Sequence, residues 1–109
     1  MISTANHASD IPLESFETLH TLKGIFPDAT VAQCIEQLTK NDVLLLMESG
    51  VNNLLIPEFL TTLTKIGLPV YALQDDTDAR KINSESIKMI SHLQFVDLSI
   101  SSQRIINWF

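Results

Sequence analysis

The stretch Val43-Leu44-Leu45-Leu46-Met47 decides the fold of this chain. It is a continuous apolar run, with none of the alternation of apolar and polar residues expected of a strand that has one face in water. A central strand of a parallel sheet is covered on both faces and is apolar throughout. The run is far shorter than the roughly 20 apolar residues that cross a membrane. It therefore predicts a buried strand in a parallel sheet.

The chain on either side of this run alternates between strand and helix signals. Asp28 or Thr30 is a suitable helix cap, and Thr30 with Gln33 fits a T-x-x-Q capping box. Gly67 followed by Pro69 is typical of a helix end. Short apolar segments that resemble strands cover residues 19–22, 70–73, 87–90 and 105–109, and helical segments cover residues 30–38, 57–66, 79–82 and 91–100. This order predicts an α/β fold: a small three-layer domain with a mainly parallel sheet of about five strands flanked by helices.

The length of 109 residues allows one domain. Residues 1–18 are rich in Ser, Thr, Asn and Asp, and Pro12 would break a helix there. We interpret residues 1–18 as a flexible extension and residues 19–109 as the folded domain.

Charge and cysteine content narrow the function. Thirteen acidic and seven basic side chains give a formal net charge of −6, and the nearest approach to a basic patch is Arg80-Lys81. Because phosphate neutralisation dominates nucleic-acid affinity, direct binding to DNA or RNA is disfavoured. The single cysteine, Cys34, excludes an intrachain disulfide and suits a reducing compartment. The first residues lack the pattern of a secretory signal, so we expect a cytoplasmic protein without a membrane segment.

Several short segments, each weak alone, occur in an order and spacing that resemble the TusB/DsrH family. The resemblance covers residues 19–109 and rests on Leu19-His20-Thr21-Leu22, Leu44–Leu46 with Gly50-Val51, Val70-Tyr71-Ala72-Leu73 with Asp76 and Ala79-Arg80, Phe95–Ile100, and Trp108 near the end.

The resemblance implies a subunit rather than an enzyme that acts alone. Members of the wider group have a compact α/β fold, and three related chains form a heterohexamer with two copies of each. The expected partners are related DsrF/TusC-like and DsrE/TusD-like subunits. The complex passes persulfide sulfur towards 2-thiolation of the wobble uridine of tRNA, and a sister complex takes part in sulfur oxidation. In the Tus branch the essential cysteine is on the D subunit, and the B subunit is structural.

Cys34 is the candidate sulfur carrier, because the DsrH branch has a cysteine at about this place on its first helix. A persulfide carrier needs a thiolate, which a position near a helix N-terminus favours modestly. Cys34 shares a helix face with Val31 and Leu38, however, and Glu36 would oppose ionisation. We favour a core residue and a structural subunit. The alternatives are a DsrH-type persulfide carrier that uses Cys34, and a stand-alone domain that binds a small ligand.

Other polar residues have plainer interpretations. His20 has no second ligand at metal spacing and is favoured as a structural or interface residue. Asp75, Asp76 and Asp78 lack the glycine and distal glutamate of a calcium loop, and they more simply complement a helix N-terminus. The sequence therefore predicts no metal site.

Three further residues complete the set of candidates. Gly50 follows a buried strand, but it belongs to no phosphate-binding pattern and is favoured as a turn residue. No cofactor is expected. Tyr71 and Trp108 are large amphipathic side chains of the kind enriched at interfaces, and they are our candidate interface residues. For Trp108, closure of the core is an equal alternative.

Overall fold

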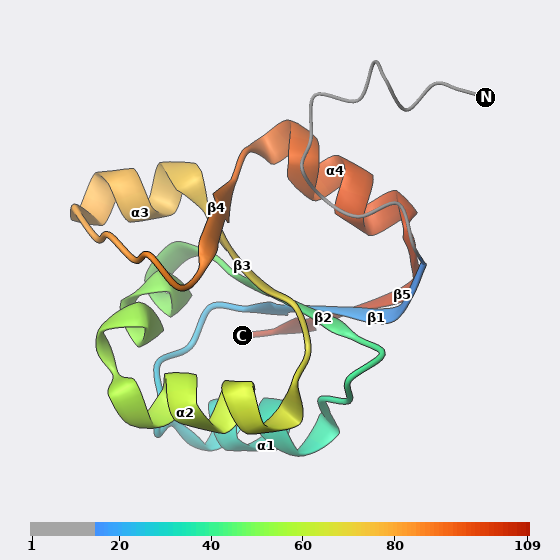
Figure 1. Ribbon diagram of the computed structural model, residues 1–109, viewed down its shortest axis with the longest axis horizontal. Coiled ribbons are helices and arrows are strands. Elements are labelled where there is room, and N and C mark those ends of the chain that lie inside the picture. The colour runs from blue at the N-terminus through green and yellow to red at the C-terminus, as the bar shows by residue number, and fades with distance from the viewer. Residues whose placement is uncertain (1–14) are drawn as a thin grey trace.

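The computed structural model describes residues 15–109 and shows a five-stranded sheet with helices on both sides (Figure 1). All strand pairs are parallel, in the order β4-β3-β2-β1-β5. The predicted α/β fold is confirmed. The strands are β1 (Phe16–Leu22), β2 (Val43–Leu46), β3 (Val70–Leu73), β4 (Lys88–Ile90) and β5 (Ser102–Trp108). The helices are α1 (Ala29–Gln37), the 3₁₀ helix η2 (Glu48–Leu55), α2 (Pro57–Ile66), α3 (Gln74–Arg80) and α4 (His92–Ile100).

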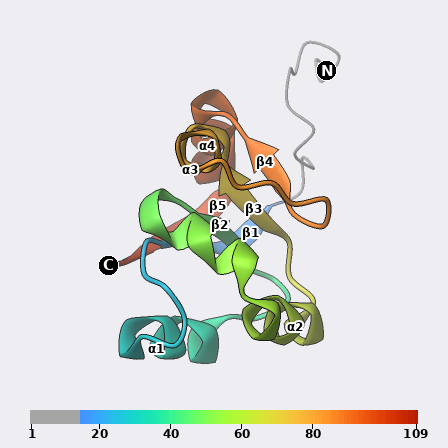
Figure 2. The same ribbon diagram turned by 90° about the vertical axis from the view of Figure 1, so that its left-hand side faces the viewer.

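Strand β2 is the middle strand and is buried on both faces, as its apolar run predicts. Helices α1 and α2 lie on one side of the sheet and α4 on the other (Figures 1 and 2). Leu44 and Leu46 belong to the apolar cluster beneath α1 and α2. Val43 and Leu45 belong to the cluster beneath α4. A parallel strand covered in this way has no solvent face on which polar residues could alternate.

The helix ends show which sequence signals decide them. Helix α2 begins with Pro57 and ends at Gly67, whose φ of 81° places it in the left-handed region. Ser91 caps α4 through a capping box with Gln94. The predicted box of Thr30 and Gln33 is wrong: Asp28 is the cap of α1, and its side chain accepts a hydrogen bond from the Thr30 backbone N–H. A carboxylate is a strong N-cap, and with Asp28 as the cap the helix starts at Ala29, two residues earlier than it would with Thr30 as the cap.

The predicted starts of three elements, β1, β5 and α3, differ from the structure by three residues or more. Strand β1 begins at Phe16 rather than at Leu19, so the predicted extension loses its last residues to the strand. Backbone pairing explains this, because the Phe16 N–H donates to the Ser101 carbonyl at 3.0 Å. Residues 1–14 lie outside the described part of the chain. Strand β5 begins at Ser102 rather than at Ile105. As an edge strand it tolerates polar side chains that the apolar pattern does not count.

Helix α3 begins at Gln74, earlier than predicted, and so contains all three aspartates. Asp75 and Asp76 lie in its first turn, where carboxylates complement the helix dipole as expected. Asp78 lies further along and does not act at the N-terminus. Among the described residues, no helix is long and apolar enough to span a membrane.

Candidate functional site

A buried polar network joins β1, the start of β2 and the end of β5. His20 is 1% exposed and Asp42 is 3% exposed. The His20 Nε2 atom lies 3.1 Å from Asp42 Oδ2, and the Trp108 indole Nε1 lies 3.0 Å from His20 Nδ1. The His20 and Trp108 rings are stacked, with centroids 6.2 Å apart. The network therefore ties the C-terminal strand to the central part of the sheet.

The hydrogen-bond partners assign the tautomer of His20. An indole N–H can only donate, so His20 Nδ1 accepts and the neutral ring carries its proton on Nε2. That proton is directed at the Asp42 carboxylate, which also accepts from the Thr39 backbone N–H at 3.0 Å. Both ring nitrogens are thus engaged within the chain. A general base needs a free nitrogen facing its substrate, so the geometry supports the structural interpretation of His20.

Trp108 is half-buried on the edge strand, with its polar atom directed inward to His20. It pairs in register with Leu22 and packs against the cluster beneath α1 and α2. Within a single chain it therefore closes the sheet edge. Tyr71 is 8% exposed and lies in the cluster beneath α4. The structure does not bring Tyr71 and Trp108 together, because they belong to clusters on opposite sides of the sheet. Their interface role stays a prediction.

Cys34 lies on α1 and is fully buried, among apolar neighbours such as Val31 and Leu38. Burial raises the pKa of the Cys34 thiol from 9.0 to about 12, because the apolar surroundings disfavour the charged thiolate. A reactive cysteine has the opposite environment, with partial exposure and a nearby positive charge. In this conformation the Cys34 thiol is protonated at neutral pH and out of reach of a sulfur donor.

The aspartates of α3 point to separate partners. Asp76 Oδ2 accepts from the Glu48 backbone N–H at 2.6 Å, and Asp75 Oδ2 lies 3.2 Å from His92 Nε2. Asp78 accepts from the Gln74 side chain at 2.8 Å. Within residues 15–109, no group of three or more metal-ligating side chains converges. A cation site therefore has no support in this segment.

The carboxyl ends of the strands, where open α/β sheets commonly bind ligands, carry a small set of polar contacts. Lys23 follows β1 directly. Its Nζ atom lies 3.1 Å from Glu48 Oε2 and 5.4 Å from the centroid of the Phe109 ring. Gly50 lies against the end of β1, where a Cβ would overlap the Leu22 carbonyl oxygen. The close approach of the two backbones explains Gly50, which lies in the 3₁₀ helix η2 rather than in the predicted turn.

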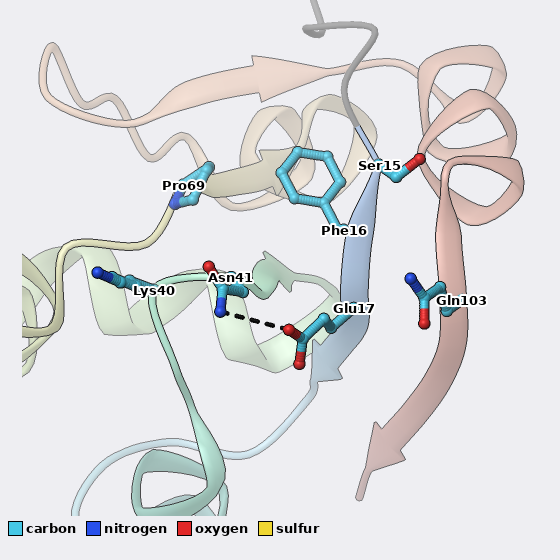
Figure 3. Close-up of a pocket in the computed structure, with 7 residues that line it drawn as sticks. All are labelled: Ser15, Phe16, Glu17, Lys40, Asn41, Pro69 and Gln103. Atoms are coloured by element: carbon cyan, nitrogen blue, oxygen red, sulfur yellow. Dashed lines mark hydrogen bonds between the residues drawn. The ribbon is translucent and has the colours of Figure 1, made fainter.

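The opposite end of the sheet has a hollow of about 420 Å³ (Figure 3). It is lined at the amino ends of the strands by Ser15, Phe16, Glu17, Lys40, Asn41, Pro69 and Gln103. Asn41 donates to Glu17 at 3.3 Å, and Lys40 is the only basic side chain among the described residues of the lining. A smaller hollow of about 270 Å³ reaches His20 and Asp42 from the same end. Among the described residues, the linings of both hollows are mainly polar and contain no cysteine.

Sequence reasoning missed Asp42 as the partner of His20. The signal was present, because a polar residue inside a buried strand needs a hydrogen-bond partner. Asp42 directly precedes the central apolar run, and the register places Leu19 beside Val43. The pairing of His20 with Trp108 was not visible, because it depends on β5 returning beside β1.

Fold and site together define a class of protein: a small parallel α/β domain whose buried polar network stabilises the sheet and whose single thiol is inaccessible. The chain belongs to the DsrH-like family. The family model described as "DsrH like protein" matches residues 23–105. The chain is 30% identical over 94 residues to Protein TusB of Salmonella arizonae and, equally, of Salmonella typhimurium, which covers 83% of this chain and 99% of each relative. The resemblance to the TusB/DsrH family is confirmed.

Proposed function

We propose that this chain is a structural subunit of a sulfur-relay complex. The complex would pass persulfide sulfur towards 2-thiolation of the wobble uridine of tRNA in the cytoplasm. Family membership supports the sulfur-relay role, and the full burial of Cys34 supports a subunit that does not itself carry sulfur. The related TusC-like and TusD-like subunits are its proposed partners in a heterohexamer, and the reactive cysteine belongs to a partner.

The observation that carries the structural role is the full burial of Cys34, which raises the pKa of its thiol. With a pKa of about 12, the thiolate fraction at pH 7 is on the order of 10⁻⁵. Thiolate, not thiol, attacks a persulfide donor. Transfer through Cys34 would therefore require α1 to move away from the sheet. The alternative function, a DsrH-type persulfide carrier that uses Cys34, depends on such a movement.

Co-expression with TusC-like and TusD-like chains tests the proposal. The purified complex is incubated with a cysteine desulfurase and cysteine, and alkylated persulfides are then located on each chain by mass spectrometry. We expect the label on a partner and none on Cys34. The matched variant is Cys34→Ala, which keeps a small apolar side chain. It should support tRNA thiolation in cells within about twofold of wild type.

Three results would contradict this proposal. Persulfide on Cys34 at a level comparable with the partner's cysteine would make the chain a carrier. Loss of thiolation in the Cys34→Ala strain, with the complex still assembled, would lead to the same conclusion. The third is a wild-type chain that forms no complex with either relative, which would favour the alternative of a stand-alone domain that binds a small ligand.

A further inference from the structure

Helix α4 exposes an apolar stripe on the side that faces away from its own sheet. Leu93, Val96 and Ile100 are 66%, 51% and 77% exposed, and their spacing places them on one helix face. Leu98 is the buried residue of the helix, with Phe95 packed beside it. The outward face is thus at least as apolar as the inward face. A helix that is apolar on both faces is normally buried on both.

A fourth exposed apolar side chain lies on the strand that follows α4. Strand β5 follows α4 directly (Figure 1). Ile105 on β5 is 46% exposed and pairs with Leu19, whose side chain lies in the cluster beneath α4. Ile105 therefore faces the same side of the sheet as α4. We name the surface formed by Leu93, Val96, Ile100 and Ile105 the α4–β5 face.

The charge of the surrounding segment also distinguishes this face. Residues 91–109 contain one acidic side chain, Asp97, and one basic side chain, Arg104, so the formal net charge of −6 comes entirely from residues 1–90. The core of a protein–protein interface is depleted in charged residues and more apolar than the surrounding surface. An aliphatic, nearly neutral face on an acidic chain has this composition.

We propose that the α4–β5 face binds a different α/β subunit of the relay complex; this inference rests on the function proposed above. The face extends over a helix and the neighbouring strand, and none of its four residues lines the hollows described above. A peptide segment binds in a groove, whereas a broad surface of this kind fits the face of a folded subunit. A second copy of this chain would bring another net charge of −6 close to the first, which opposes association.

Co-expression of the full chain with its TusC-like and TusD-like relatives tests this assignment. Val96→Glu places a carboxylate at the centre of the stripe. Burying an unpaired charge is costly, so we expect recovery of the chain in the complex to fall at least tenfold. Ile100→Lys, at the most exposed position of the face, should act in the same direction. Because both side chains are exposed in the single chain, each variant should keep the wild-type circular dichroism spectrum.

Leu55→Glu is the matched control. Leu55 is 63% exposed on η2, comparable with Leu93, but lies outside the α4–β5 face. It should leave recovery in the complex within about twofold of wild type. Equal loss for Leu55→Glu, or full assembly of both α4 variants, would overturn the assignment of this face while leaving the subunit role intact. A homodimer of the chain alone that Val96→Glu dissociates would assign the face to a second copy and overturn the proposal. Failure of wild type to assemble with either relative would remove the proposed function and this inference with it.

Discussion

At the scale of single residues, burial decides the chemistry of Cys34. A helix N-terminus would favour the thiolate by a few tenths of a kcal/mol to about 1 kcal/mol, but Cys34 is the sixth of the nine residues of α1 and lies beyond the first turn, where this effect acts. Desolvation acts in the opposite direction and raises the pKa by about three units, which corresponds to roughly 4 kcal/mol. Desolvation is the larger effect, so Cys34 behaves as a small apolar side chain of the core. This is the interpretation that the pattern of neighbouring residues favoured.

The raised pKa of Cys34 predicts how stability depends on pH. Between pH 9 and pH 12 the unfolded thiol loses its proton, whereas the buried thiol keeps it. The native state then binds more protons than the unfolded state, so the free energy of unfolding falls as the pH rises. We expect a fall of about 1.4 kcal/mol per pH unit above pH 9, relative to Cys34→Ala. Urea titrations at pH 8.0, 9.5 and 10.5 measure it. If the free energy of unfolding changes equally with pH in the wild type and in Cys34→Ala, the thiol ionises in the folded state.

At the scale of elements, the helix ends depend on local backbone chemistry. Gly67 ends α2 in the left-handed region, and no atom lies within 4 Å of the position that a Cβ would occupy there. A side chain at this position therefore meets no steric contact, and the cost of a substitution comes from the backbone alone. The end of α2 was predictable from Gly67 and Pro69 because glycine adopts the left-handed conformation of a helix end and proline cannot continue the helix.

Replacing Gly67 with alanine should reduce the free energy of unfolding by about 1 kcal/mol, because an L-residue is strained at a φ of 81°. Gly67→Asn is the control, since asparagine adopts the left-handed conformation more readily. It should lose less than half as much. Chemical denaturation of the three proteins makes the comparison. An equal loss in both variants would point to packing rather than to the backbone.

At the scale of the whole molecule, the chain closes on itself through its last strand. Strand β5 lies at the edge beside β1, and the hydrogen bond from Trp108 to His20 joins residues that are 88 positions apart. Asp42 completes the network from the loop before β2. A partly buried side-chain hydrogen bond thus holds the edge strand to the first strand, in addition to the backbone ladder.

Trp108→Phe removes the indole donor but keeps an aromatic ring, so His20 Nδ1 loses its partner. Leaving a buried acceptor unsatisfied costs about 1–3 kcal/mol, and we expect a loss of stability in this range. Trp108→Ala should lose more, because it also removes apolar packing, and it should weaken assembly with partner subunits. Thermal unfolding and size-exclusion chromatography report the two effects. Unchanged stability in Trp108→Phe would mean that water replaces the indole.

The sequence by itself determined the fold class, the central strand, most element positions and the family. These follow from local patterns: an apolar run marks a strand covered on both faces, and capping residues mark helix ends. It also favoured the core position of Cys34. The start of β1 and the extent of β5 were not predicted from the sequence, because backbone pairing rather than side-chain type sets those limits.

Only the tertiary structure decided the order of the strands and what depends on it. The return of β5 beside β1 brings Trp108 to His20, and no local pattern encodes a contact over that separation. The same holds for the α4–β5 face. The sequence shows Leu93, Val96 and Ile100 at helical spacing, but that spacing does not show which side of the helix meets the sheet. In the structure Leu98 and Phe95 pack against the sheet, and the stripe faces outward. Periodicity locates a stripe on a helix, but only packing shows which side of the helix the sheet covers.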